Sequence, residues 1–322
     1  MSSLWLDSAY HSAQVPLSTH SAYMTIRGPP RTSPKQPIVL IQCGAADCSS
    51  SFVATTRLIA NFARVITYDR AGLGKSSNAH EPPNAANRAK QLHELLEKVD
   101  VKPPFVLVGH SLGGLLIPYY LTTFRPGDIA GVVFIDSPCT SAFKARMLTP
   151  SLLGCLDPRT PEGERKYEEV IGIDQFKDVL TDAERAEIAA DRATSSGVRE
   201  ELQMAMQIGK QADDLSPVLY EKQVLGQHRM SVLWGGILGD FQRVLRYAEV
   251  HGHGTEDERQ EMKEFLADWG KTENVKQRER LQLAMGGYGR LVQVTDGATH
   301  ELQLTRPDII AQEVRWVLAL DA

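Results

Sequence analysis

The chain has 322 residues, a formal net charge of −5 and 42% hydrophobic residues, so it can bury a large single core, with or without an inserted cap. Acidic and basic residues are interspersed, which excludes the basic face that nucleic acids require and the polybasic segment that binds anionic membranes. The four cysteines lack the Cys-x-x-Cys spacing of zinc or redox sites, and we expect them to be reduced and mostly buried.

The N-terminal segment, residues 1–17, lacks the basic stretch and following apolar stretch of a secretory signal. No apolar run reaches the length that spans a bilayer. We therefore expect a cytoplasmic protein without a membrane span, whose partner is a small-molecule substrate rather than a nucleic acid. The oligomeric state stays open.

Five short apolar runs in the first half of the chain predict strands, at residues 22–26, 38–41, 64–68, 105–108 and 131–135. Residues 84–99 repeat apolar or small side chains at helical spacing, a stripe that can cover one face of a sheet: Ala85, Ala89, Leu92, Leu95, Leu96 and Val99. Buried strands that alternate with such helices predict an α/β fold with a mostly parallel sheet.

The strand at 105–108 runs directly into Gly109-His110-Ser111-Leu112-Gly113-Gly114, and an apolar helical segment follows at residues 115–124. This order of strand, Gly-x-Ser-x-Gly and helix is typical of a nucleophile elbow. Glycines on both sides of Ser111 allow a sharp turn and a close approach of neighbouring segments. The pattern predicts an exposed serine nucleophile; the alternative is a plain glycine-rich turn between strand and helix.

The strand pattern stops after Pro138 and resumes near residues 230–234. Between these points the chain is charged and helical, with a capping box at Thr181 and Glu184 and amphipathic segments at 161–170, 181–192 and 198–208. We expect residues 139–229 to form a helical lid inserted into a core made of residues 1–138 and 230–322. The charged residues of the lid are interpreted as solvated helix faces.

The stretch Tyr68-Asp69-Arg70-Ala71-Gly72-Leu73-Gly74-Lys75-Ser76, together with the sequence around Ser111, resembles the α/β-hydrolase family. The similarity is closest to esterase-like members that read Tyr-Asp-Arg-Ala-Gly-x-Gly. The resemblance implies an eight-stranded, mostly parallel sheet with helices on both faces, and a triad of serine, histidine and acid. A phosphate-binding loop is not indicated, because Asp69 stands where that motif requires glycine.

A serine hydroxyl needs a base to remove its proton, and His300 fits this role best. It follows a predicted strand at residues 291–294 and precedes a final helix at 307–320, which is where the family carries its catalytic histidine. His110 is interpreted as pointing away from the site. His251 and His253 lack further ligands to complete a metal site, so we assign them to a polar loop.

Two residues compete for the acid that orients the histidine. Asp136 ends the strand at 131–135, a position where some family members carry their acid, and a strand end holds a side chain rigidly. Asp240 follows the strand at 230–234 after a glycine-rich stretch, the more usual family position. We favour Asp136 over Asp240; the alternative reading of Asp136 is a structural carboxylate that accepts backbone N–H groups.

Acyl transfer also needs donors for the developing oxyanion. The family takes them from the residue after the nucleophile and from the loop after an early strand, which gives Leu112 and Ala45 here. This chain has Cys43-Gly44 where the family often has His-Gly. We expect the Cys43 side chain to serve packing rather than reactivity.

The predicted function is a serine hydrolase that cleaves a carboxylic ester, lactone or thioester of a small, largely apolar substrate through an acyl-enzyme. No metal or organic cofactor is implied. Family members that attack haloalkanes or epoxides use an aspartate at the elbow, and Ser111 argues against both. Two alternatives stay open: a triad enzyme that cyclises or joins a biosynthetic intermediate, and a ligand-binding receptor of the same fold with little turnover.

Overall fold

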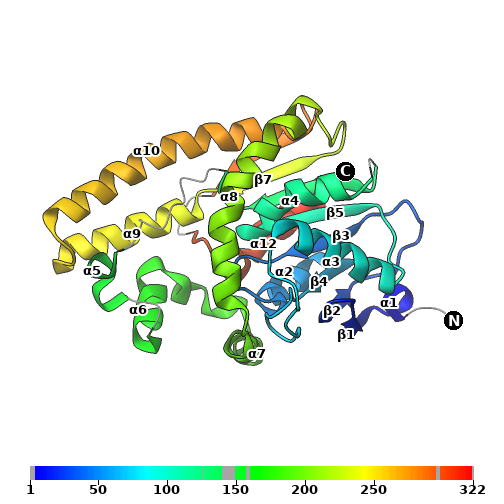
Figure 1. Cartoon of the computed structure of the whole chain (residues 1–322), viewed down its shortest axis with the longest axis horizontal. Coiled ribbons are helices and arrows are strands. Elements are labelled where there is room, and N and C mark those ends of the chain that lie inside the picture. Colours follow the sequence, from blue (N-terminus) through cyan, green and yellow to red (C-terminus); the bar gives the residue numbers. More distant parts are fainter. Residues whose placement is uncertain (1–3, 126, 140–148, 157–159, 295–297, 321–322) are drawn as a thin grey trace.

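A computed structural model describes residues 4–125, 127–139, 149–156, 160–294 and 298–320. Its centre is an eight-stranded sheet (Figure 1). In spatial order the strands are β1 (Tyr10–Pro16), β2 (Ser21–Arg27), β4 (Val65–Tyr68), β3 (Ile38–Gln42), β5 (Phe105–His110), β6 (Ile129–Ile135), β7 (Met230–Trp234) and β8 (Gly289–Gln293).

The sheet is mostly parallel, as the sequence predicts. β2 pairs antiparallel with β1 and β4, and every other neighbouring pair is parallel. β1 is the strand that the sequence pattern missed. It lies at the edge of the sheet and buries only Val15, so it shows no apolar alternation of the kind that marks a half-buried strand.

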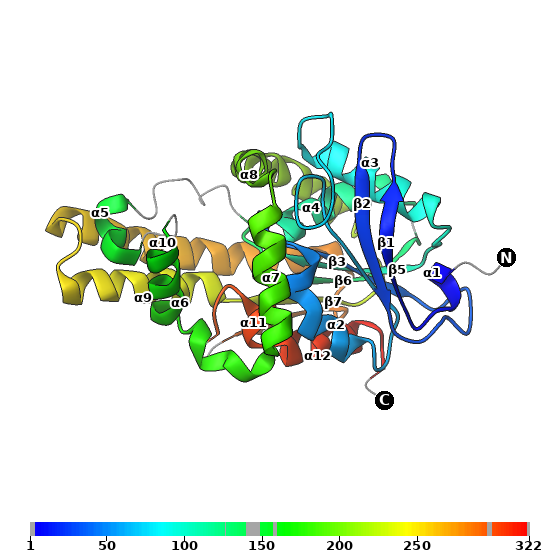
Figure 2. The same cartoon turned by 90° about the horizontal axis from the view of Figure 1, so that it is seen from below.

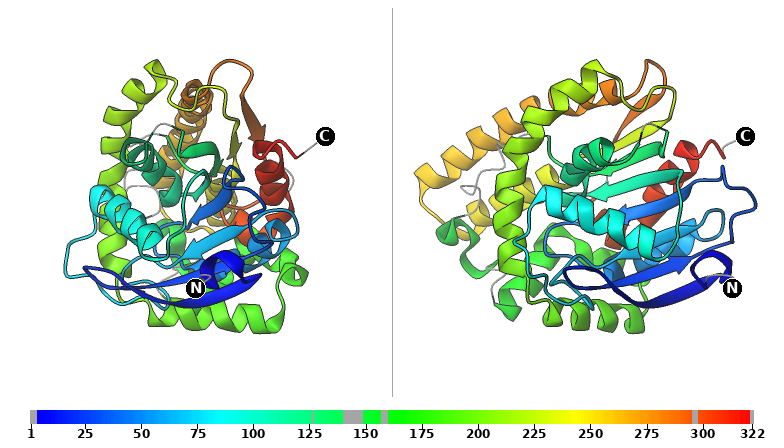
Figure 3. Two further views of the ribbon diagram at one scale, coloured as in Figure 1. Left: turned by 90° about the vertical axis from the view of Figure 1, so that its right-hand side faces the viewer. Right: turned by 45° about the vertical axis from the view of Figure 1, so that its right-hand side comes forward.

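Helices cover both faces of the sheet (Figure 3). On one face lie α3 (Ala85–Lys98) and α4 (Leu112–Thr123), and on the other lie α2 (Val53–Ile59) and α12 (Pro307–Val317). Successive strand residues point to opposite faces. Leu40 therefore joins the buried cluster on the α3–α4 side, whereas Val39 and Ile41 join the cluster on the α2–α12 side.

The remaining helices are short or belong to insertions. Within the described ranges, the short ones are α1 (Leu4–Asp7), α11 (Leu302–Thr305) and the 3₁₀ helices η1 (Ser49–Phe52), η2 (Gly154–Leu156), η3 (Ile173–Val179) and η4 (Leu281–Leu283). Between β6 and β7 the chain inserts α5 (Pro150–Leu153), α6 (Pro161–Ile171), α7 (Asp182–Thr194) and α8 (Val198–Glu221). These four helices and their connections are called the β6–β7 insertion below.

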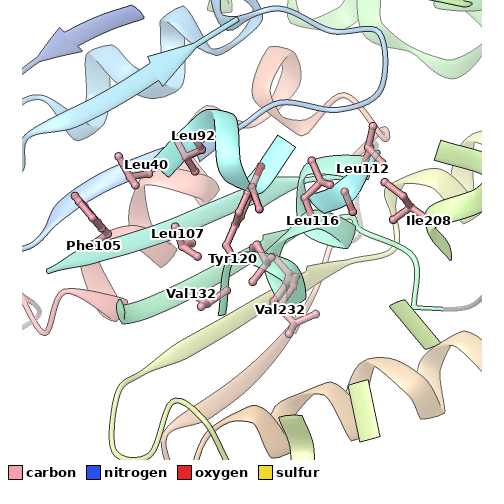
Figure 4. Packing of buried hydrophobic residues seen from close by; sticks show 14 of the residues in the cluster. Leu40, Leu92, Phe105, Leu107, Leu112, Leu116, Tyr120, Val132, Ile208 and Val232 are labelled. Atoms are coloured by element: carbon pink, nitrogen blue, oxygen red, sulfur yellow. The ribbon is translucent and has the colours of Figure 1, made fainter. Parts of the chain in front are cut away.

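The β6–β7 insertion is anchored to the core through α8. Ile208 of α8 lies in the same buried cluster as Leu116 and Tyr120 of α4 and the strand residues beneath them (Figure 4). The predicted capping box of Thr181 and Glu184 is present at the start of α7. Residues 140–148 and 157–159 of the expected lid lie outside the described ranges, and the boundary at 139–229 stays a proposal.

A second insertion, between β7 and β8, was not predicted. It is a hairpin of two long helices, α9 (Gly236–His251) and α10 (Glu256–Arg280), that projects beyond the sheet beside α5 and α6 (Figures 1 and 2). One expectation from the sequence is therefore wrong. His251 ends α9 rather than standing in a polar loop, and Asp240 lies in the first turns of the same helix.

Three predicted helix boundaries also shift. The helix after Ser111 begins at Leu112 rather than at residue 115, α8 continues to Glu221 rather than ending at 208, and the last helix ends at Val317. No helix within the described ranges combines the length and the apolar character that a bilayer crossing requires.

The close approach of α4 to the end of β3 makes Gly113 a sensitive position. A Cβ at Gly113 would lie 2.2 Å from the backbone oxygen of Gln42, so we expect Gly113→Ala to lower the free energy of unfolding by about 1–3 kcal/mol through overpacking. The matched control is Gly239→Ala in α9, where the added Cβ would lie 3.6 Å from the nearest atom, on Arg243. We expect Gly239→Ala to raise the free energy of unfolding by roughly 0.5–1 kcal/mol. Urea denaturation measures the stability of both variants. A Gly113→Ala variant as stable as the parent would contradict the close contact between α4 and the end of β3.

Candidate active site

Ser111 stands at a strained turn between β5 and α4. Its backbone has φ 50° and ψ −117°, a left-handed conformation that costs free energy for a residue with a side chain. The N–H of Ser111 donates to the carbonyl of Ile135 in β6 at 3.0 Å, which holds the turn. Gly109 permits the tight turn, because a Cβ at this position would lie 2.7 Å from the backbone of Gly113.

His300 lies opposite the elbow, just before α11, and is held at three points. Its ring Nδ1 lies 2.7 Å from Oδ2 of Asp136, and its backbone N–H donates to Oδ2 of Asp240 at 2.7 Å. Its carbonyl oxygen lies 2.9 Å from Nε2 of His110. Both acids that the sequence offered therefore contact His300, Asp136 at the imidazole and Asp240 at the backbone.

The Asp136 carboxylate is itself fixed by the start of α9. It accepts the backbone N–H groups of Gly235 and Gly236 at 3.0 Å and of Ile237 at 2.6 Å. These N–H groups have no partner within the helix, and the positive end of the helix dipole favours an anion there. The Asp136 side chain is fully buried. It contacts the His300 ring and also accepts backbone N–H groups, so both interpretations of Asp136 from the sequence apply to the same carboxylate.

His110 contributes more than the sequence suggested. Its side chain does not point away from the site but lines the same pocket as Ser111 and His300, and its ring lies 4.6 Å from that of His300. Burial lowers the pKa of His110, and the charge of His300 adds to this effect. A neutral His110 can donate from Nε2 to the carbonyl of His300. This hydrogen bond links the residue before Ser111 to the backbone of His300.

The environment of His300 favours its protonated form. Burial disfavours the imidazolium, but the hydrogen bond and the charge of Asp136 outweigh burial and raise the pKa of His300 to about 9. Burial raises the pKa of Asp240 to about 7, against the opposing effects of the His300 backbone N–H and of Arg243. The negative charge at the His300 imidazole therefore comes mainly from Asp136.

Two backbone N–H groups flank the elbow. Leu112 is the first residue of α4, so its N–H has no acceptor within the helix. Ala45 lies in the segment after β3, residues 43–47, called the β3 loop below, and lines the pocket beside Ser111. The side chain of Cys43 in this loop is buried, and burial raises the pKa of its thiol well above the usual value, which does not fit a reactive thiolate.

Ser111 and His300 open onto one pocket of about 490 Å³. Its lining comes from the β3 loop, from the end of β5 and the elbow, from the two insertions, and from residues 300–304. The apolar part of the wall consists of Tyr167, Ile171, Ile173, Leu202, Ile237, Phe241 and Leu304. The polar part consists of Asp47, Glu164, Glu168, Arg192, Asp240 and Glu301, and within it Arg192 pairs with Asp47 at 3.4 Å.

His251 and His253 lie away from this pocket. The His251 ring stacks on Tyr247 with the ring centroids 3.9 Å apart. Among the residues that the structure describes, no three His, Cys, Asp or Glu side chains are grouped so as to hold a metal ion.

Comparison with known proteins shows the family of the chain. Residues 38–313 match the model of the alpha/beta hydrolase family. The chain belongs to this family. A protein of Gibberella zeae named as an AB hydrolase superfamily protein is 29% identical over 304 residues, which cover 92% of this chain and 91% of that protein. A Hormonema carpetanum protein named as a transporter is 26% identical over 98% of this chain, but the match spans only 44% of its length.

Among solved structures, the enol-lactonase of Burkholderia xenovorans superposes with a TM-score of 0.57 at 16% identity, over 95% of this α/β hydrolase and all of that chain. At this identity the likeness shows the shared fold and carries no statement about the reaction.

The contacts of His300 predict how its pKa responds to substitution. Asp136→Asn removes the carboxylate at Nδ1 while burial persists, so we expect the pKa of His300 to fall from about 9 to 6.5 or below. Asp240→Asn leaves the ring contact in place and should lower this pKa much less. NMR titration of the imidazole Cε1–H signal, assigned with His300→Gln, measures both. Equal shifts in the two variants would show that Asp136 is not the main source of the effect.

Proposed function

We propose that this α/β hydrolase is a serine hydrolase of carboxylic esters, lactones or thioesters, with Ser111 as nucleophile, His300 as base and Asp136 as acid. The observation that carries the proposal is the combination of the strained Ser111 and the His300–Asp136 pair at one pocket. Backbone strain at a serine, beside a histidine that is held by a buried carboxylate, is typical of a functional site.

In the first half of the reaction, the Ser111 hydroxyl attacks the carbonyl carbon as Nε2 of His300 takes its proton. Asp136 stabilises the imidazolium that forms and keeps Nδ1 protonated, so that Nε2 is free to act. The C–O or C–S bond of the substrate then breaks, and His300 gives the proton to the leaving group. In the second half, water attacks the acyl-enzyme by the same route and releases the acid and Ser111.

The N–H groups of Leu112 and Ala45 are the proposed donors to the oxyanion. They belong to the start of α4 and to the β3 loop, the two segments that flank Ser111 in the pocket. Such donors strengthen their hydrogen bonds as negative charge develops on the oxygen, and the loss of one typically lowers kcat by about 10²–10³-fold.

The pocket suits a small substrate with an apolar portion. A volume of about 490 Å³ lies in the range of about 300–1,000 Å³ that small-molecule sites occupy. Its apolar side chains come mainly from α6, η3 and α9. Cyclic esters should be assayed beside linear ones, since an enol-lactonase shares this fold.

A fluorophosphonate probe followed by intact-mass analysis tests the nucleophile. We expect one adduct on the parent protein and none on Ser111→Ala, because only an activated serine reacts. Labelling of both proteins would assign reactivity to another residue. Labelling of neither would contradict the hydrolase proposal and favour a receptor or a cyclising enzyme of the same fold.

Steady-state kinetics with a p-nitrophenyl ester tests the acid. We expect Asp136→Asn to lower kcat by about 10⁴-fold, the effect of an equivalent change in a serine triad. Asp240→Asn alters the acceptor of the His300 backbone N–H and the ion pair with Arg243, neither of which involves the imidazole, and should cost far less. A larger loss in Asp240→Asn would reverse the assignment.

A further inference from the structure

A buried charge cluster contacts the β3 loop, and neither of its two main members, Arg70 and Glu201, lines the pocket. Arg70, in the loop after β4, and Glu201, in the first turn of α8, form an ion pair with Nη2 and Oε2 2.8 Å apart. A second hydrogen bond joins Nε of Arg70 to Oε1 of Glu201 at 2.8 Å. The side chains are 2% and 0% exposed, so water contributes little to either charge.

Both members of the pair also hold the β3 loop. Arg70 donates from Nη1 to the carbonyl of Cys43 at 2.8 Å and from Nη2 to the carbonyl of Gly44. Glu201 accepts the backbone N–H of Ala46 at 2.9 Å. Residues 70, 43–46 and 201 thus form one network, although the pair spans 131 positions in the sequence.

These contacts fix the direction of the Ala45 N–H. The carbonyl of Gly44 and the N–H of Ala45 belong to one planar trans peptide unit, so they point in opposite directions. With the Gly44 oxygen turned to Arg70 on the buried side, the Ala45 N–H is turned away from Arg70. Ala46 adopts a left-handed backbone with φ 58° and turns its own N–H back to Glu201, which separates the two donors.

We propose that Arg70 and Glu201 are positioning residues that aim the Ala45 N–H at the oxyanion, so that the β6–β7 insertion completes the oxyanion hole through α8. This inference rests on the proposed serine hydrolase function. Neither side chain lines the pocket. Arg70 acts through the Gly44 carbonyl, and a cation bound to that oxygen also polarises the peptide unit and strengthens its N–H as a donor.

Both groups stay ionised in their buried setting. Burial disfavours the charge of Glu201, but the Arg70 guanidinium outweighs it and holds the pKa of Glu201 below the usual value. A planar guanidinium is also the one cationic side chain that reaches both carbonyls and both carboxylate oxygens at once. A lysine at position 70 would keep the charge but lose this geometry.

Arg88 supplies a matched control within the same cluster. It donates to Oε1 of Glu201 at 3.2 Å and to the carbonyl of Ala71 at 3.2 Å, and it is as buried as Arg70. Its hydrogen bonds go to Gln91, Ala71 and Glu201, and none of these residues belongs to the β3 loop. Arg70→Lys and Arg88→Lys therefore both disturb the contacts of Glu201 with its buried cations, and only the first also disturbs the β3 loop.

The experiment compares the parent protein with Arg70→Lys, Arg88→Lys and Glu201→Gln, using p-nitrophenyl acetate as substrate and phenylboronic acid as a mimic of the tetrahedral intermediate. For Arg70→Lys and Glu201→Gln we expect kcat to fall by about 10²-fold, the cost of one oxyanion donor, with KM little changed. The affinity for phenylboronic acid should weaken in parallel, because it reports on the transition state. Arg88→Lys should keep the parental kcat, even where its Tm falls.

Equal losses of kcat in Arg70→Lys and Arg88→Lys would overturn the inference and leave the cluster a purely structural device. So would an effect confined to KM, or no effect at all. If Glu201→Gln does not fold, the comparison of the two lysine variants decides. If the parent protein shows no hydrolysis that depends on Ser111, the proposed function itself is contradicted. The assay of the parent protein and Ser111→Ala detects this outcome without the other variants.

Discussion

The buried carboxylate of Asp136 is the contact on which the candidate site depends. It joins three parts of the chain that are distant in sequence: the end of β6, the start of α9 and the segment that carries His300. A buried anion of this kind is tolerated because three backbone N–H groups and an imidazole surround it. The same hydrogen bonds set where α9 begins and hence where the helical hairpin leaves the sheet.

Much of the architecture could be read from the sequence because its signals are local. Strand β5 is a continuous apolar run, and the glycines around Ser111 are required by contacts with adjacent backbone. Asp136 was favoured because it ends a buried strand, and its contact with the His300 ring fits that reasoning. In each case the residues that carry the signal lie within a few positions of the feature that they determine.

The parts that sequence reasoning missed depend on distant partners. No helix was predicted after the strand at 230–234, yet Gly235 and Gly236 open α9: Gly235 needs its φ of 131°, and a Cβ at Gly236 would lie 2.3 Å from the Thr299 carbonyl. Glu201 belongs to a charged, amphipathic helix that was interpreted as solvated, and no local pattern marks it as fully buried. Only the folded chain brings Arg70 to it.

The start of α8 is also docked on the loop after β4 by its backbone. The Gly197 N–H donates to the Gly72 carbonyl at 2.8 Å, and the Gly74 N–H donates to the Ser195 hydroxyl at 2.8 Å. Residues 195–201 therefore belong mechanically to the sheet domain, although the chain order assigns them to the insertion. A chimera that borrows pocket walls from a relative should be joined ahead of Ser195, since exchange of α5 to α7 alone keeps this docking surface intact.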